Sequence, residues 1–194
     1  MSRSKEGSPE AGGMMRYGIP KYRLPRRVLD QEIARILDLG VKLELNTTVK
    51  DIEEEKNTNG YDAVFLAVGA GMAKNAYIPG GDAKHMLDAV SVLRSMEGEE
   101  EPLLGRKVVV YGGGNTAMDT ARAAKRNAGV EKVSLVYRRT RRYMPADEEE
   151  LVMAVEDGVE FAELLAPVKL EQGVLYCKRT VSYTHLTLPT TPYV

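Results

Sequence analysis

Three small residues at a fixed spacing could hold a phosphate group. Gly112, Gly114 and Ala117 form the pattern G-x-G-x-x-A. In such a turn the first glycine allows a sharp change of direction and the second lets the backbone approach a pyrophosphate. The alanine lets the following helix pack closely on a sheet, with its N-terminus facing the phosphate charge. The pattern is weak alone, so a strand must precede it and a helix must follow it.

The elements that must position this turn flank it on both sides. An apolar run at residues 108–111 is typical of a buried parallel strand, and a helical pattern covers residues 116–127. A second apolar run covers residues 133–137. Strand, glycine turn, helix and strand within about 30 residues predict a βαβ unit with a right-handed crossover.

Arginines follow the second predicted strand, at the point where a dinucleotide site distinguishes its cofactors. An NAD site usually has Asp or Glu there to accept a hydrogen bond from the ribose 2′-hydroxyl. Arg138, Arg139, Arg141 and Arg142 stand there instead, and guanidinium can bind a 2′-phosphate through two parallel hydrogen bonds. The pattern favours NADPH over NADH. The alternative is a solvated basic face, which is the usual role of a charge cluster.

Composition excludes several classes of protein. The 194 residues carry a net charge of -1, so no global field attracts nucleic acid or an anionic membrane. No apolar run reaches transmembrane length, and the N-terminus has no signal-peptide pattern. The single cysteine, Cys177, forms no internal disulfide and no metal cluster. We expect a cytoplasmic protein without a metal site, a nucleic-acid partner or a membrane partner.

The first half of the chain predicts a second, smaller set of elements. Prolines keep residues 12–25 extended or turned, and a helix follows at 26–39 with Gly40 as its stop. A half-buried strand is expected at 41–45, an acidic loop at 51–60 and a buried strand at 62–69. Beyond them we expect a turn-rich loop at 78–82, a helix at 87–96 and a charged linker at 98–102.

The segment after the βαβ unit predicts a helix at 147–156, with Leu151, Val152 and Val155 on its apolar face. Strands are expected at 159–162 and 168–170, with a hairpin turn at Gly173. Residues 181–194 look like a translated sequencing adapter and are left out of the fold. We therefore expect two modules, residues 1–97 and residues 98–180, with their boundary at the charged linker.

Four stretches together resemble the glutamate synthase small-subunit family of FAD- and NADPH-binding oxidoreductases, which is related to the N-terminal half of dihydropyrimidine dehydrogenase. They are GGMMRYGIPKYRLPRRVLDQEI at 12–33, DAVFLAVGA at 62–70, GGGNTAMDTARAAKR at 112–126 and VYRRTRRYMPADEEE at 136–150. The resemblance implies an α/β fold of Rossmann-like βαβ modules in a two-domain FAD/NAD(P)-binding architecture, present here only in part. It implies that residues 1–97 form a partial FAD-binding domain and residues 98–180 a truncated NADPH-binding domain.

The same resemblance assigns cofactor contacts to individual residues. For FAD it implies a ribose contact at Glu6, flavin-facing backbone at Gly13 and Met14, a contact at Arg23 and an adenine contact at Val49, with Gly69 ending the strand that closes over the cofactor. For NADPH it implies a pyrophosphate turn at Asn115, Thr116 and Ala117 beside Gly112 and Gly114, and a 2′-phosphate site at Arg138, Arg139 and Arg142. No catalytic acid, base or nucleophile stands out. None is required, because hydride passes directly between the two cofactors.

The departures from the family pattern suggest an internal fragment. The first glycine fingerprint is absent, and residues 1–5 are too polar for the apolar strand that should deliver Glu6. We expect iron–sulfur centres only in an N-terminal part that this sequence lacks, and no tight binding of FAD. The parent would pass electrons from NADPH through FAD and iron–sulfur centres to a larger acceptor subunit. The alternatives are a non-catalytic NADPH-binding module and an inactive fragment.

Overall fold

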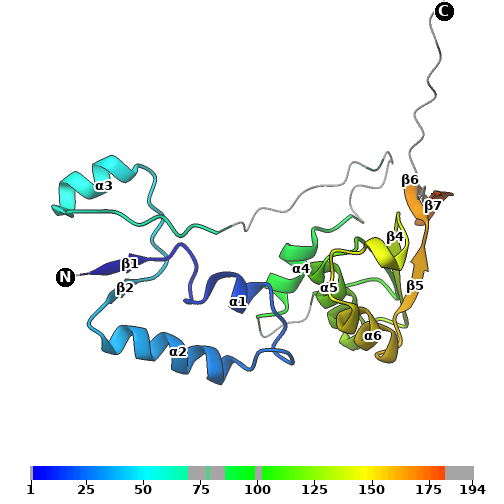
Figure 1. Ribbon diagram of the computed structural model, residues 1–194, viewed down its shortest axis with the longest axis horizontal. Helices are drawn as coiled ribbons and strands as arrows, with labels where there is room; N and C mark the ends of the chain where they lie inside the picture. Colours follow the sequence, from blue (N-terminus) through cyan, green and yellow to red (C-terminus); the bar gives the residue numbers. More distant parts are fainter. Residues whose placement is uncertain (1, 70–77, 79–85, 99–101, 182–194) are drawn as a thin grey trace, which may run out of the picture. The chain divides into compact units, whose positions relative to one another are not determined.

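The computed structural model describes residues 2–69, 78, 86–98 and 102–181. These residues divide into two compact units, one made by residues 2–69, 88–98 and 102, the other by 78, 86–87 and 103–181. Figure 1 shows both units and labels most of their helices and strands. Most of the turn-rich loop expected at 78–82, the centre of the linker expected at 98–102 and nearly all of the expected tail at 181–194 lie outside the described residues.

The second unit is built on a parallel sheet in the order β3-β4-β5. Strand β3 (Lys107–Tyr111) leads through the glycine turn into α5 (Asn115–Arg126), which returns the chain to β4 (Lys132–Tyr137). Helix α6 (Glu148–Glu156) then connects β4 to β5 (Glu160–Glu163). The predicted βαβ unit is confirmed, and its helix begins one residue earlier than expected.

The core of this unit lies between the sheet and its two helices. Because successive right-handed crossovers place their helices on one face of a sheet, α5 and α6 pack side by side (Figure 1). Met118 of α5 and Val133 and Leu135 of β4 are fully buried there. Truncating such a side chain to Ala typically costs about 2–5 kcal/mol, so this core holds the glycine turn and the end of β4 in place.

The buried face of α6 differs from the one expected. Leu151 is buried as predicted, but Val152 and Val155 are 41% and 50% exposed. The fully buried partner of Leu151 is Ala154. An alanine allows a close approach of α6 to α5, and this packing turns the two valines toward the outside.

A β-hairpin completes the second unit. Strands β6 (Leu165–Glu171) and β7 (Val174–Arg179) pair antiparallel. Gly173 joins them with a φ of 74°, a conformation that glycine adopts without strain. The predicted hairpin is confirmed. A 3-10 turn, η2 (Arg141–Tyr143), follows β4.

The first unit contains a short parallel pair, β1 (Arg3–Lys5) and β2 (Lys42–Glu44). The expectation that the polar start of the chain forms no strand before Glu6 is therefore wrong. Backbone pairing and the ion pair between Arg3 and Glu44, at 2.8 Å, hold β1 without apolar side chains. The strand predicted at 41–45 is confirmed in shorter form.

Three of the four helices described in this unit are α1 (Gly13–Tyr17), α2 (Arg26–Asp38) and α4 (Ala89–Ser95). Helix α1 lies in the stretch expected to be extended or turned, whereas the predicted α2 and α4 are confirmed. Leu29 is the buried residue of α2, and Ile36 is 55% exposed. Asp88 caps α4 by accepting hydrogen bonds from the backbone N–H groups of Val90 and Ser91.

The acidic loop expected at 51–60 is wrong, because these residues form α3 (Ile52–Asn59). The Asp51 carboxylate caps the helix by accepting from the N–H groups of Glu53 and Glu54 at 2.9 and 3.0 Å. Glutamates in the first turn complement the helix dipole, and Gly60 ends the helix with a φ of 64°. Capping at both ends therefore stabilises α3, although residues 52–59 have only a weak apolar pattern.

The buried strand expected at 62–69 is also wrong. Residues 62–68 carry no strand pairing to any described residue, and Phe65 and Val68 are 91% and 88% exposed. A central strand needs a neighbour on each side to satisfy its N–H and C=O groups. Within the part of the chain that the structure describes, β1 and β2 pair only with each other.

Candidate functional site

The glycine turn between β3 and α5 is tightly packed. A Cβ atom at Gly112 would stand 3.0 Å from the Cβ of Ala117, so the glycine and the alanine together let the helix approach the strand. Gly113 lies against the ring of Tyr137, where an added Cβ would stand 2.4 Å from Cε2. Gly114 has more room, with its nearest neighbour at 4.0 Å. The turn is shaped by close contacts at its first two glycines and is open at the third.

The start of α5 presents backbone donors. Gly114 is the N-cap and provides no side chain to cap the helix, while its carbonyl accepts from Ala117 at 2.9 Å and from Met118 at 3.2 Å. Among the described residues, no hydrogen bond engages the N–H groups of Asn115 and Thr116. Unpaired N–H groups at a helix N-terminus are suited to an anion, so this turn could hold a pyrophosphate.

The segment after β4 is tied to this turn. The N–H of Ala146 donates to the carbonyl of Gly113 at 3.0 Å. The side chain of Asn115 accepts from the N–H of Asp147 at 3.2 Å and donates to its carboxylate at 3.4 Å. Asn115 thus connects the two segments, so its amide acts on the loop rather than remaining free for a ligand.

The predicted 2′-phosphate arginines are brought to the same edge of the sheet as the turn. Arg138, Arg139 and Arg142 are exposed, and within the described ranges no ion pair or side-chain hydrogen bond occupies their guanidinium groups. Arg141 differs, because it pairs with Glu148 at 2.6 Å. Three of the four arginines therefore present unneutralised charge at the end of β4.

Two contacts that the sequence did not predict shape this loop. The Tyr137 hydroxyl donates to the carbonyl of Tyr143 at 2.6 Å, and the Glu163 carboxylate accepts from the N–H of Arg141 at 2.7 Å. Tyr137 and Glu163 both lie at the end of the sheet, where they are paired residues of β4 and β5. Neighbouring strands could have suggested their proximity, but no local pattern marks Glu163.

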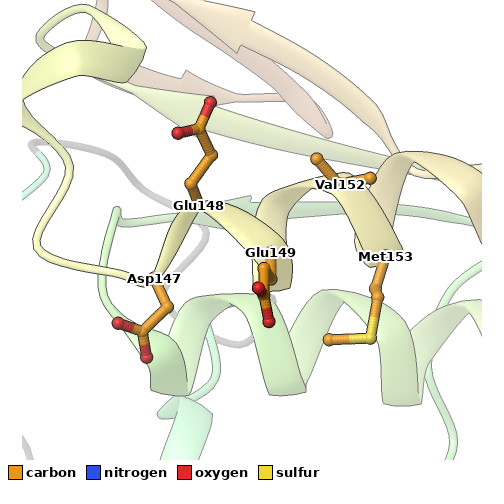
Figure 2. A pocket seen from close by; sticks show the side chains of 5 residues that line it. All are labelled: Asp147, Glu148, Glu149, Val152 and Met153. Carbon is orange, nitrogen blue, oxygen red and sulfur yellow. The ribbon is translucent and has the colours of Figure 1, made fainter.

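Two depressions lie along the loop and α6. One, of about 550 Å³, is lined by basic, acidic and apolar residues: Arg141, Arg142, Met144, Ala146, Asp147, Glu148 and Leu151. The other, of about 790 Å³, is lined by Asp147, Glu148, Glu149, Val152 and Met153, and Figure 2 shows their side chains along α6. Its three carboxylates would repel phosphate groups. The first depression shares Asp147 and Glu148 with the second but is also lined by Arg141 and Arg142, so it is the more compatible of the two with a phosphate group.

A buried ion pair fastens α5 to α6. Arg122, 7% exposed, donates to the carboxylate of Asp157 at 2.6 Å, and Arg126 donates to it at 2.6 and 2.9 Å. Burial raises the pKa of Asp157, but the hydrogen bonds from Arg126 and Arg122 outweigh burial and leave this pKa below its ordinary value. These ion pairs hold α6, the helix that follows the arginine loop (residues 138–142).

The FAD residues predicted in the first unit lie on its loops. Glu6 follows β1, and its carboxylate accepts from the N–H of Ser8 at 2.9 Å. Gly13 begins α1 with a φ of 48°, directly after Gly12 with a φ of 123°. Both values lie in a region that favours glycine. Met14, in the first turn of α1, is 40% exposed.

The other three predicted FAD residues lie elsewhere in this unit. Arg23 is exposed in the turn before α2, where its N–H donates to the carbonyl of Pro20 at 2.9 Å. Val49 lies between β2 and α3 and is 37% exposed. Gly69 follows the exposed residues 62–68 with a φ of 66°. Among the described residues, no side-chain hydrogen bond or ion pair joins Arg23, Val49 and Gly69 to one another.

Two arginines that sequence analysis missed, the buried Arg16 and the half-buried Arg26, hold the glycine–methionine segment at residues 12–15. Arg16, 5% exposed, pairs with Glu10 at 3.0 Å and with Asp30. Arg26 donates to the carboxylate of Glu97 at 2.8 Å and to the carbonyls of three residues of the loop before it. Those residues are Arg16, Ile19 and Leu24. Arg16 belongs to the string R-Y-G-I-P and Arg26 to the string P-R-R. Neither string indicates that its arginine holds the backbone in place; only the fold shows it.

The described residues show neither a metal centre nor a membrane span. No group of three or more His, Cys, Asp or Glu side chains is arranged there to hold a metal ion. In the same residues, every helix is too short or too polar to cross a membrane.

Similarity to characterised proteins extends over most of the chain. It is 42% identical over 169 residues to the NADP(+)-dependent formate dehydrogenase subunit beta of Moorella thermoacetica, covering 85% of this chain and 24% of that protein. It is 40% identical over 171 residues to the NADPH-Fe(3+) oxidoreductase subunit beta of Geobacter sulfurreducens, covering 85% and 25%. It is 34% identical over 175 residues to the Escherichia coli glutamate synthase [NADPH] small chain, covering 84% and 37%. The chain thus spans about a quarter of the first two relatives.

Solved structures share the fold at low identity. FprA from Mycobacterium tuberculosis in complex with NADPH has a TM-score of 0.70 at 17% identity, covering 94% of this chain and 61% of that one. A 2-naphthoyl-CoA reductase has a TM-score of 0.74 at 18% identity, covering 92% and 26%.

The resemblance to the glutamate synthase small-subunit family is confirmed by these relatives. Residues 26–164, which include the glycine turn and the arginine loop, match the family profile of pyridine nucleotide-disulphide oxidoreductases. The chain belongs to the pyridine nucleotide-disulphide oxidoreductase family.

Proposed function

We propose that this chain carries the NADPH site and part of the FAD site of an NADPH-dependent oxidoreductase of the glutamate synthase small-subunit kind. The observation that carries the proposal is the meeting of two features at one sheet edge. One is the glycine turn, with N–H groups of α5 free to face a pyrophosphate. The other is the exposed set of Arg138, Arg139 and Arg142.

The glycine turn and the arginine loop bind different parts of NADPH. The backbone at Gly114, Asn115 and Thr116 holds the pyrophosphate, and Ala117 keeps α5 close to β3. Arg138 and Arg139 bind the ribose 2′-phosphate, for which guanidinium has matching donors. When bound, NADPH supplies a hydride that FAD accepts, so the protein residues bind and orient rather than donate or remove protons.

In the first unit we propose the FAD contacts at Glu6, Gly13, Met14, Arg23, Val49 and Gly69. The left-handed backbone at Gly12 and Gly13 leaves no side chain there, which fits a close approach by a flat ring system. Because Phe65 and Val68 are exposed and unpaired among the described residues, we propose that the chain alone holds FAD weakly and is inactive. A purified chain with flavin absorbance retained through gel filtration would contradict that part.

For the whole protein we propose electron transfer from FAD through iron–sulfur centres to a larger acceptor subunit in the cytoplasm. Two of the relatives are named as subunits beta and one as a small chain, which supports an assembly with a partner. The test is copurification of the full-length parent from its native source. A partner and iron in the purified complex support the proposal, and a lone, iron-free protein that oxidises NADPH would overturn it.

The experiment that tests the NADPH site is fluorescence titration of the 194-residue chain with NADPH and with NADH. Tighter binding of NADPH supports the assignment. Equal binding of the two would overturn it, whatever the state of the FAD site.

A further inference from the structure

The backbone of the arginine loop is held by the strands that follow it. The carbonyl of Arg138 accepts a hydrogen bond from the Thr180 hydroxyl, and the carbonyl of Arg139 accepts from the N–H of Leu164 at 3.2 Å. The N–H of Arg141 donates to Glu163 at 2.7 Å. These contacts hold the main chain while the guanidinium groups of Arg138 and Arg139 stay exposed.

Among these contacts, Glu163 provides the one made by a side chain of the parallel sheet. It ends β5 in register with Tyr137, the residue immediately before Arg138. The 3-10 turn Arg141–Tyr143 begins after Thr140, which offers no side-chain cap. The Glu163 carboxylate takes the cap position from another strand and satisfies the first N–H of the turn.

The backbone beside Glu163 is itself unusual. Leu164 has a φ of 59°, a conformation that a bulky side chain rarely adopts. Its N–H reaches Arg139 and its carbonyl accepts from Thr180 at 2.8 Å. Such a conformation persists where surrounding contacts fix it, so the end of β5 is a rigid support for the arginine loop.

No ion pair among the described residues accounts for the position of Glu163. The described residues include no cation within ion-pair distance of its carboxylate, since the nearby Arg141 side chain pairs with Glu148 instead. A negative charge beside a 2′-phosphate site weakens phosphate binding. The contact that the Glu163 carboxylate does make is the hydrogen bond from the N–H of Arg141, at 2.7 Å.

Resting on the proposed function, we infer that Glu163 is a positioning residue for recognition of the 2′-phosphate. Its carboxylate caps the Arg141–Tyr143 turn and so sets the direction in which the loop presents Arg142 and its neighbours. The role requires a hydrogen-bond acceptor and not a charge. A glutamine at this position can serve, and an alanine cannot.

The test is titration of the 194-residue chain and three variants with NADPH and NADH. Loss of a charge-assisted hydrogen bond predicts that Glu163→Ala binds NADPH about five- to tenfold more weakly, with NADH changed by less than about twofold. Glu163→Gln keeps an acceptor, so its NADPH affinity stays within about twofold or rises. Glu160→Ala, at the opposite end of β5 and paired with Lys132 at 2.7 Å, is the matched control and leaves both affinities unchanged.

Hydrogen exchange of the peptide containing Arg141 gives an independent readout: exchange is faster in Glu163→Ala and unchanged in Glu163→Gln. NADPH binding by Glu163→Ala that equals or exceeds that of the unmodified chain would overturn the inference. Equal weakening toward NADPH and NADH would also overturn it, because that is a loss of fold. An unmodified chain that binds both nucleotides equally would overturn the proposed function as well, whereas a discriminating chain unaffected by Glu163→Ala would overturn the inference alone.

Discussion

The ring of Tyr137 lies against Gly113, at the point where the glycine turn meets the end of β4. The Tyr137 hydroxyl also donates to the carbonyl of Tyr143 at 2.6 Å. A single side chain therefore contacts the proposed pyrophosphate turn through its ring and the arginine loop through its hydroxyl. Tyr137 therefore connects the two parts of the proposed NADPH site.

Gly113→Ala tests this packing. The added Cβ would stand 2.4 Å from Cε2 and 2.7 Å from Cδ2 of a ring that is 7% exposed and fixed by its hydrogen bond. Overpacking of this kind costs about 1–3 kcal/mol, and urea unfolding followed by circular dichroism measures it. Gly105→Ala, whose Cβ would meet nothing nearer than 3.8 Å, should change stability by less than about 0.5 kcal/mol. Equal stability of both variants would contradict the account.

Arg26→Lys tests the support of the glycine–methionine segment. Lysine keeps the charge but cannot reach Glu97 and the carbonyls of Arg16 and Ile19 together, since only the planar guanidinium has donors in that arrangement. We expect a loss of about 1–3 kcal/mol and faster hydrogen exchange at residues 16–24. Arg27→Lys is the matched control, because Arg27 is exposed. Unchanged exchange in Arg26→Lys would refute this role.

Asp157 predicts how stability depends on pH. Its folded-state pKa lies below the ordinary value of 3.8, so the charged form contributes stability that is complete above about this pH. The contribution disappears as the pH falls through the folded-state pKa. Asp157→Asn should therefore be less stable than the unmodified chain near neutral pH, with the difference shrinking in acid. Glu156→Gln, at an exposed neighbouring position, should show no such trend in urea unfolding from neutral to acidic pH, and a pH-independent deficit in Asp157→Asn would refute the assignment.

The sequence predicted the elements whose local pattern agrees with their packing. The βαβ unit was predictable because its strands are continuously apolar and its turn needs glycine at Gly112. The strand at 62–69 was wrong because its apolar pattern requires neighbouring strands that the described residues do not provide. Helix α3 was missed because Asp51 and Gly60 specify it through capping, with little contribution from burial.

The candidate site was predictable only where residues that are close in sequence, or joined by one βαβ unit, are also close in space. The turn around Gly114 and the arginines after β4 follow from the βαβ geometry. The contact of Glu163 with Arg141 joins positions far apart in sequence, and an exposed glutamate has no distinctive pattern. The pairing of Asn115 with Asp147 is of the same kind.

The central claim is that the exposed arginines after β4 bind a 2′-phosphate, and titration with NADPH and NADH tests it most directly. We expect the 194-residue chain to prefer NADPH, and Arg138→Ala with Arg139→Ala to remove about 2–4 kcal/mol of that preference, as loss of two charge-assisted contacts implies. Arg106→Ala, which removes an exposed guanidinium paired with Glu131 at 2.7 Å, should keep it. Equal affinity for NADPH and NADH in the unmodified chain, or an undiminished preference in the double variant, would contradict the account.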